Sequence, residues 1–233
     1  TGSYAFSGPA DADGYLTYGD ASRVNYELSY TSWSVGANYA LTENSALFGS
    51  VSSGGSATAP SRITGSLLAN GDLNDEKSGY STVDQIELGY KYRGDSADVY
   101  VTLFSADTEE AGGFEVTTQQ VIENTYESKG VEVEGMYDFG NGFALNGGVT
   151  VTDAEITKSN NAANVGNKPR RQADYIFNVT PTYTSESGTH NVGLNFVGTD
   201  DTYIQDNNEG QFDGYVVTNL FYNYQLSDNT SLS

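Results

Sequence analysis

Apolar and polar residues alternate along segments of strand length, and tight polar turns separate these segments. The clearest case is residues 83–92, in which one set of side chains is apolar (Ile86, Leu88, Tyr90, Tyr92) and the other is polar (Gln85, Glu87, Lys91). Because successive side chains of a strand point to opposite faces, this segment has one apolar and one polar face. The alternation returns in residues 142–153 and 175–183. The pattern predicts an all-β antiparallel protein and is typical of both soluble sandwiches and membrane barrels.

The alternating segments predict about ten strands. We place them at residues 23–40, 45–54, 83–93, 96–106, 115–126, 129–139, 142–155, 173–184, 189–199 and 214–226. The phase of the first strand changes at Thr31-Ser32, which predicts a bulge or the emergence of the strand from a membrane there. Pro181 lacks a backbone donor, so we expect a bulge or a sheet edge at that position.

The spacing of the connections favours a membrane barrel over a sandwich. Short turns are expected near residues 42–44, 93–95, 140–142, 185–188 and 227–229, and long polar loops at 1–21, 55–82, 107–114, 156–172 and 200–213. Two strands and one long loop therefore separate consecutive short turns. This is the arrangement of up-and-down transmembrane β-barrels, which have short periplasmic turns and long extracellular loops. We accordingly expect the short turns to face the periplasm.

Aromatic residues gather beside the expected short turns, as in the girdle that membrane barrels place at the lipid–water interface. They are Tyr39, Tyr90, Tyr92, Tyr137, Phe139, Phe143, Tyr183, Tyr222 and Tyr224. The alternative is that aromatics simply favour strands and pack in a soluble core. The chain contains 18 Tyr against 1 Trp and no Cys, which fits the barrel interpretation.

Composition narrows the possible functions. The mean hydropathy of -0.46 is uninformative for a barrel, which offers only every second residue to lipid. There is no apolar run of transmembrane-helix length and no signal peptide at Thr1. The absence of cysteine removes disulfides, zinc thiolate sites and thiol nucleophiles. A net charge of -21 argues against nucleic-acid binding.

The sequence offers little support for catalysis or for a cofactor. The single histidine, His190, starts a strand beside a turn, and no motif supports a Ser-His-Asp arrangement. Residues 206–210 carry oxygen ligands at alternating spacing, but the glutamate that would complete an EF-hand loop is missing. We therefore expect no enzymatic activity, metal or cofactor.

Charge is distributed unevenly among the expected long loops. Lys158, Lys168, Arg170 and Arg171 fall in one loop, whereas the last loop is strongly acidic. The basic loop is either a patch for an anionic ligand or for lipopolysaccharide, or ordinary solvated charge. The turn at residues 227–230 leads into a strand that has barely begun at Ser233, so we expect further chain to follow, because an open barrel edge in lipid is costly.

Several segments resemble the TonB-dependent outer-membrane receptors. They are residues 38–52 followed by Pro60, the run Glu87-Leu88-Gly89-Tyr90-Lys91, the run Gly130-Val131-Glu132-Val133-Glu134, the run Asp153-Ala154-Glu155-Ile156, and Lys168-Pro169-Arg170-Arg171 leading to Tyr175. They come in the family's order along most of the chain.

The resemblance implies a barrel of about twenty-two strands that is filled by an N-terminal plug. Residues 1–233 would be a middle-to-late part of a single barrel domain, without the plug or the last strands. The whole receptor would import a scarce nutrient (an iron-siderophore, cobalamin or a sugar) across the outer membrane of a Gram-negative bacterium. Its partners would be outer-membrane lipid and lipopolysaccharide, its own plug, the TonB complex that supplies energy, and the small nutrient ligand.

The resemblance also suggests site residues. Barrel-wall glutamates of the family meet plug arginines, and Glu87, Glu132 and Glu134 lie in the matching strands on the polar face; the alternative is simple hydration of a water-filled lumen. Arg170 and Arg171 are the candidate ligand contacts. Two other functions stay open: a self-contained smaller barrel, such as an outer-membrane protease, porin or secretion translocator, and a β-rich surface adhesin.

Overall fold

The protein is built on one large antiparallel sheet. The computed structural model describes residues 2–3, 22–23, 27–58, 79–115 and 120–233. Within these ranges the sheet has 10 strands. They are β3 (Trp33–Ala40), β4 (Ser45–Ala57), β5 (Tyr80–Arg93), β6 (Ala97–Glu115), β7 (Gln120–Gly140), β8 (Phe143–Ser159), β9 (Tyr175–Thr184), β10 (His190–Thr199), β13 (Tyr215–Ser227) and β14 (Thr230–Leu232). Two small pairs accompany it: β1 (Gly2–Ser3) with β2 (Ser22–Arg23), and β11 (Thr202–Tyr203) with β12 (Gln211–Phe212).

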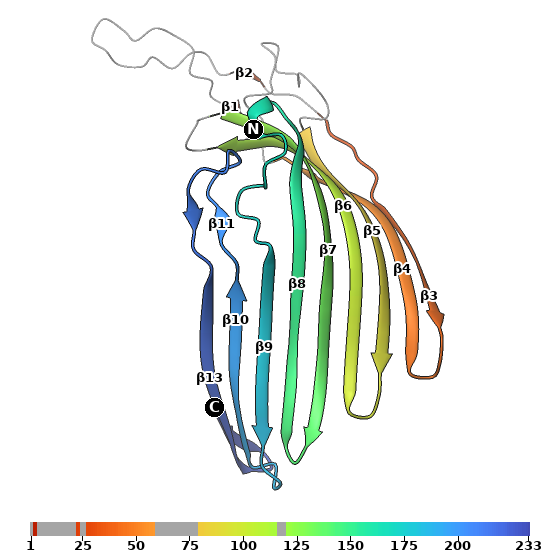
Figure 1. Ribbon diagram of the computed structural model, residues 1–233, viewed down its shortest axis with the longest axis vertical. Helices are drawn as coiled ribbons and strands as arrows, with labels where there is room; N and C mark the ends of the chain where they lie inside the picture. The colour runs from red at the N-terminus through yellow and green to blue at the C-terminus, as the bar shows by residue number, and fades with distance from the viewer. Residues whose placement is uncertain (1, 4–21, 24–26, 59–78, 116–119) are drawn as a thin grey trace, which may run out of the picture.

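The strands follow one another in the sheet, which confirms the up-and-down architecture. The order is β14-β13-β10-β9-β8-β7-β6-β5-β4-β3, so the described sheet is open, with β14 and β3 at its edges. Figure 1 shows the hairpin turns of β3–β4, β5–β6, β7–β8, β9–β10 and β13–β14 at one end of the sheet, and the long β8–β9 and β10–β13 connections at the other. Among the described connections, the short turns and these two long connections therefore lie at opposite ends, as the sequence predicts.

The two faces of the sheet differ as they do in a membrane barrel. On the face that we call the outer face, apolar side chains are exposed; Leu88 is 60% exposed and Leu220 72%. Among the hydrophobic side chains whose burial the structure describes, those in the core are Ala154, Ile156 and Ala173, and only Ile156 is fully buried. A soluble sandwich would bury its apolar face against a second sheet. Here the apolar face is outward, as contact with lipid requires.

All nine aromatic residues of the predicted girdle lie on the outer face, in the strand ends beside the short turns. The rings pack against one another: Tyr137 and Phe139 are 4.7 Å apart between ring centroids, and so are Phe143 and Tyr183. Rings of this kind suit the boundary between lipid tails and headgroups, because one end is apolar and Tyr carries a polar tip. The girdle marks one boundary of the lipid-facing band.

The other boundary is visible on β7. Its outward positions are apolar or glycine from Phe139 back to Val131, whereas the next two outward positions are Lys129 and Glu127, which form an ion pair. Residues 131–139 have the length of a tilted transmembrane strand, about nine to eleven residues. The strands continue beyond this band into the aqueous region.

A row of carboxylates crosses the outer face just beyond the band. Asp84 pairs with Asp107, Asp107 with Glu127, and Glu127 with Glu155, on the adjacent strands β5 to β8. Side chains that are directly opposite on an antiparallel sheet are close enough for like charges to repel. Water and the nearby Lys129 ammonium reduce this repulsion.

The inner face, on the opposite side of the sheet, carries rows of amide and hydroxyl side chains. Asn223 donates to Asn191 at 3.2 Å, and Asn191 donates to Thr184 at 3.0 Å. In a second row on the same three strands, Asn219 donates to Asn195, which donates to Thr180. The polar phase of the alternation is thus hydrogen-bonded across β13, β10 and β9.

The predicted strands 115–126 and 129–139 are wrong as separate elements, because residues 120–126 and 129–139 belong to one strand, β7. Residue 115 ends β6, and residues 116–119 lie outside the described residues. The predicted loop 107–114 is also wrong, since these residues continue β6 to Glu115. Both errors have the same cause. Beyond the lipid band a strand has no apolar side, so polar residues occupy both phases while the backbone pairing continues. Loss of alternation therefore marks the end of the band, and not the end of the strand.

Two predicted irregularities have different outcomes. The first predicted strand, 23–40, is too long: β3 begins at Trp33, directly after the predicted phase change. Residues 24–26 lie outside the described residues. Pro181 occupies neither a bulge nor an edge, because it pairs with Leu145 in the middle of the sheet. The ladder to β10 lapses there without a change of register, and the Asn195 side chain bridges the gap to Thr180.

Candidate functional site

The three candidate glutamates lie on the inner face, on the phase opposite to the exposed apolar residues. Glu87 accepts hydrogen bonds from Ser50 at 2.9 Å and from Gln85 at 2.6 Å. These bonds satisfy its carboxylate within the wall. Glu132 and Glu134 lie two strands away on β7, and the structure gives their carboxylates no ion pair within the described ranges.

Glu132 and Glu134 border a shallow cavity of about 390 Å³ on the inner face. Thr150 on β8 and Asn178 on β9 contribute polar groups to its lining. Ile176, Val197 and Tyr215 are apolar residues at its edge, where alternation alone would place polar ones. The cavity therefore combines two carboxylates with an apolar border, and it opens toward the space that the curved sheet surrounds.

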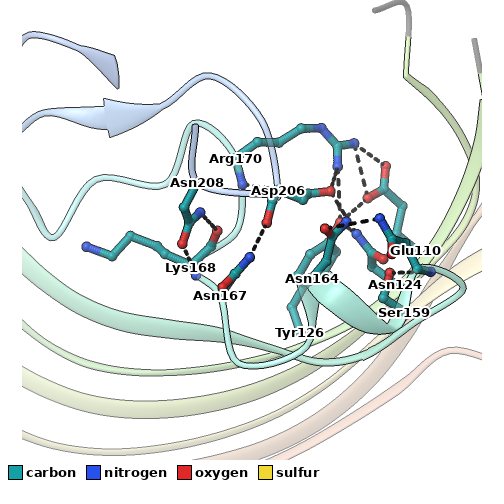
Figure 2. A network of polar contacts seen from close by, with 11 residues as sticks. Glu110, Asn124, Tyr126, Ser159, Asn164, Asn167, Lys168, Arg170, Asp206 and Asn208 are labelled. Carbon is teal, nitrogen blue, oxygen red and sulfur yellow. Dashed lines mark hydrogen bonds and ion pairs between the residues drawn. The ribbon is translucent and has the colours of Figure 1, made fainter. Parts of the chain in front are cut away.

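A second polar site lies beyond the lipid band, where Arg170 joins three parts of the chain (Figure 2). Its guanidinium contacts Glu110 of β6 at 3.1 Å and Asp206 of the β10–β13 connection at 2.7 Å. The phenol of Tyr126 on β7 donates to Glu110 and also lies 3.4 Å from the guanidinium. Figure 2 shows these side chains converging within the arc of the strands.

Asp206 is the most deeply buried charge of this site, with 3% of its side chain exposed. Its Oδ1 accepts the backbone N–H of Arg170 at 2.9 Å, and its Oδ2 accepts both the guanidinium and the Asn124 amide. A buried carboxylate is tolerated only when it is paired and hydrogen-bonded, and here both oxygens are satisfied.

The surroundings shift the pKa of two groups in this site. Burial lowers the pKa of the Arg170 guanidinium, but the opposing charges, with Glu110 first, outweigh it and raise the pKa above its ordinary value. Burial also raises the pKa of the Tyr126 phenol, and the hydrogen bond to Glu110 raises it further. Tyr126 lies past Lys129 on β7, outside the lipid-facing band. Arg170 is thus charged and Tyr126 neutral at ordinary pH.

The four basic residues of the predicted patch are not equivalent in the structure. Arg170 belongs to the buried network, and Lys168 forms an ion pair with Asp174. Lys158 is exposed on β8. Arg171 is exposed at a backbone φ of 60°, and its N–H donates to the Tyr203 carbonyl at 2.8 Å.

The other candidate groups have ordinary structural surroundings. His190 begins β10 on the exposed outer face, where its Nδ1 lies 2.8 Å from the Tyr222 hydroxyl. Asp206 and Asn208, the oxygen ligands of the weak calcium pattern, bond instead to Arg170 and to the Lys168 backbone. In the part of the chain that the structure describes, no cluster of three or more His, Asp or Glu side chains is arranged for a metal ion.

Sequence reasoning missed Glu110, Asn124, Tyr126 and Asp206 as members of the Arg170 site. They come from β6, β7 and the β10–β13 connection, so only the folded topology brings them to Arg170. Glu110 was also assigned to a loop. No local motif marks them.

Comparison with known proteins identifies the family. The family model described as TonB dependent receptor-like, beta-barrel matches residues 4–233. The chain belongs to this family. No curated protein sequence matches it. Among the described residues, no helix is long and apolar enough to cross a membrane.

Solved structures of TonB-dependent receptors share the fold. The ferric-catecholate import receptor of Escherichia coli K12 is 18% identical with a TM-score of 0.68, and the match covers 99% of this chain and 34% of that one. The ferric yersiniabactin uptake receptor of Yersinia pestis is 16% identical with a TM-score of 0.66, covering 85% and 30%. A copper transporter is 12% identical with a TM-score of 0.63, covering 85% and 32%. The chain thus spans about a third of the length of the structures it matches.

Proposed function

We propose that this chain is part of the barrel wall of an outer-membrane receptor that imports a scarce nutrient, such as an iron chelate, with energy from the TonB complex. The observation that carries the proposal is the wall itself, which is apolar outside and polar inside and has the hairpin turns of its described residues at one end. Such a wall separates lipid from a polar lumen through which a hydrophilic nutrient can pass. Family membership supports the same function.

We further propose that Glu132 and Glu134 contact basic residues of a plug that fills the lumen, and that Glu87 supports the same inner surface. The two β7 carboxylates have no ion pair within the described ranges and border a cavity, so a cationic group from another domain would complete them. The proposal places the wall in the outer membrane, surrounded by lipid and lipopolysaccharide. It assigns the wall no catalytic activity.

We call the end of the wall that carries the β8–β9 and β10–β13 connections the mouth. We propose that Arg170 and Arg171 provide the ligand contacts there. An anionic metal chelate would find the exposed guanidinium of Arg171 beside the polar network, since a guanidinium matches carboxylate oxygens in a bidentate geometry. The titles of the matched structures name ferric yersiniabactin, ferric catecholates and copper as cargo of those proteins. The uptake experiment described next identifies which of these kinds of complex the receptor imports.

The test of import uses the full-length gene product in its own outer membrane. Cells with and without the gene are given radioactive ferric citrate, a ferric catecholate or a copper salt, and uptake is measured with TonB present and absent. We expect uptake of one metal complex to require both the gene and TonB. Uptake that is the same in cells without TonB would contradict the proposal.

The plug contact has its own test. Glu132→Gln with Glu134→Gln should loosen the plug and make cells sensitive to a large antibiotic that normally fails to cross the outer membrane. Glu155→Gln is the matched control, because this carboxylate lies on the outer face. Equal antibiotic resistance of all three strains would contradict a plug contact at Glu132 and Glu134.

A further inference from the structure

The two long connections at the mouth are joined to each other along several residues. The β8–β9 connection contains the 3-10 turn η3 (Ala162–Asn164), and the β10–β13 connection contains β11 and β12. The contacts are the Asn167 amide to the Asp206 carbonyl at 2.9 Å, the Arg171 N–H to the Tyr203 carbonyl at 2.8 Å, the Lys168 N–H to Asn208 Oδ1 at 3.1 Å, and Asn208 Nδ2 to the Lys168 carbonyl at 2.7 Å. The Asn208 amide thus pairs with a backbone as a strand would (Figure 2).

Arg170 connects this joined pair to the barrel wall. Its side chain is 18% exposed and reaches Asp206 of the other connection and Glu110 of β6 at the same time. Asn124 of β7 adds a second link between the wall and Asp206, at 2.9 Å. A planar guanidinium with several donors can serve two carboxylates at once, which an ammonium group does less well.

Arg171 has a different environment although it is the next residue. Its side chain is exposed, and its backbone has a left-handed φ of 60°, a conformation that costs a non-glycine residue energy. The bond to the Tyr203 carbonyl holds it there. Because the contacts of Arg170 hold the two connections against the wall, they also fix the position of the neighbouring Arg171.

We propose that Arg170 is a positioning residue that fastens both connections to the inner wall as one body, and that Arg171 is the cation of this pair that faces an anionic ligand. The assignment of a ligand to Arg171 rests on the import function proposed above. The fastening is a property of the wall without ligand. Adjacent arginines thus divide two tasks, one structural and one of recognition.

Pulsed electron paramagnetic resonance on the full-length receptor in membranes tests the fastening without any ligand. One pair of spin labels, at Ala162→Cys and Glu209→Cys, reports the distance between the two connections. A second pair, at Glu209→Cys and Lys129→Cys, reports the distance from the connections to the outer side of the wall. We expect narrow distance distributions for both pairs in otherwise unchanged receptor.

The variants then separate the contacts. Arg170→Met should broaden both distributions about twofold, because the freed segments sample locally open states. Glu110→Gln should broaden mainly the connection-to-wall distance, since it leaves the Arg170–Asp206 pair intact. Arg171→Met is the matched control and should leave both distributions narrow. If Arg170→Met does not assemble, Asp206→Asn takes its place. Narrow distributions in the assembled variant, or equal broadening by Arg171→Met, would overturn the positioning role.

Binding of ferric citrate to the purified full-length receptor tests the second task. Arg171→Gln should weaken binding about tenfold, and Arg171→Lys should weaken it less, because it keeps the charge but loses the forked geometry. In the spin-label experiment, Arg170→Lys should broaden the distance distributions as Arg170→Met does, since the forked geometry is lost. Unchanged binding by Arg171→Gln, or no binding by the natural receptor, would overturn the ligand assignment of Arg171, while the spin-label distances still decide the role of Arg170.

Discussion

At the scale of single residues, the outward or inward direction of a side chain decides what a substitution does. Val149 and Thr150 are neighbours on β8, but Val149 lies on the outer face, 38% exposed, and Thr150 pairs with Glu132 on the inner face. Val149→Arg should impair assembly, because a cation facing lipid near the membrane middle costs about 2–4 kcal/mol. Thr150→Arg should be tolerated beside a carboxylate. The measurement is the heat-modifiable band of the full-length protein in outer-membrane preparations; equal bands would mean that Val149 does not face lipid.

Tyr126 gives a pH-dependent prediction at the same scale. The pKa of its phenol is raised above the ordinary 10.0 by burial and by Glu110. Deprotonation of the phenol therefore destabilises the folded state around Tyr126. The stabilisation is complete below about pH 10 and is lost as the pH rises toward the raised pKa. Proteolysis of the β8–β9 connection in the full-length receptor should accelerate as the pH rises above about 10, whereas Tyr126→Phe should have a flatter profile. The same acceleration in both proteins would contradict this role.

Residue directions were predictable from the sequence, but the contacts of the mouth were not. Alternation placed Glu87 and Leu88 on opposite faces, because the period of a strand is two and depends on no distant residue. Glu110 and Asp206 are far apart in the sequence, and their meeting at Arg170 depends on how two irregular connections fold. Loops lack a periodic signal, so nothing local announces such a site.

At the scale of the elements, the sequence predicted where strands cross the lipid better than where they end. Turns were located correctly because Gly, Asn and Asp mark them, as at Asn141, which has a backbone φ of 53°. β6 was ended too early and β7 was divided in two, because residues 107–110 and 123–128, beyond the band, are mostly polar on both sides. Backbone pairing needs no apolar face once the strand is in water, so hydrophobic patterning cannot report these extensions.

The row of carboxylates across β5 to β8 predicts a stabilising substitution. Asp107 stands directly between Asp84 and Glu127 on the outer face, and like charges in direct register destabilise a sheet. Asp107→Asn should stabilise the full-length barrel by about 0.2–1 kcal/mol at low salt. Thermal unfolding followed by the heat-modifiable band measures the change, with Asp200→Asn in the β10–β13 connection as the control. The gain should shrink at high salt, where charges are screened; a gain that ignores salt would indicate another cause.

At the scale of the whole molecule, three features agree about how the wall lies in the membrane. The aromatic girdle adjoins the hairpin turns, the carboxylate row lies at the opposite end of the apolar band, and the joined connections lie beyond that row. Each feature comes from a different physical requirement: interfacial aromatics, hydrated charge and satisfied polar groups in water. The turn end and the connection end therefore face different compartments.

Family barrels have short turns in the periplasm, so the connections of this wall should face the outside. Ala162→Cys lies in the β8–β9 connection and Asn229→Cys in the β13–β14 turn, and the 233-residue segment has no cysteine of its own. In the full-length protein, a membrane-impermeant thiol reagent should label Ala162→Cys on intact cells and Asn229→Cys only after the outer membrane is opened. Detergent-treated cells, in which both sites should react, are the control for accessibility. Labelling of Asn229→Cys from outside at the rate of Ala162→Cys would reverse the orientation and would move the Arg170–Asp206 site to the periplasmic side.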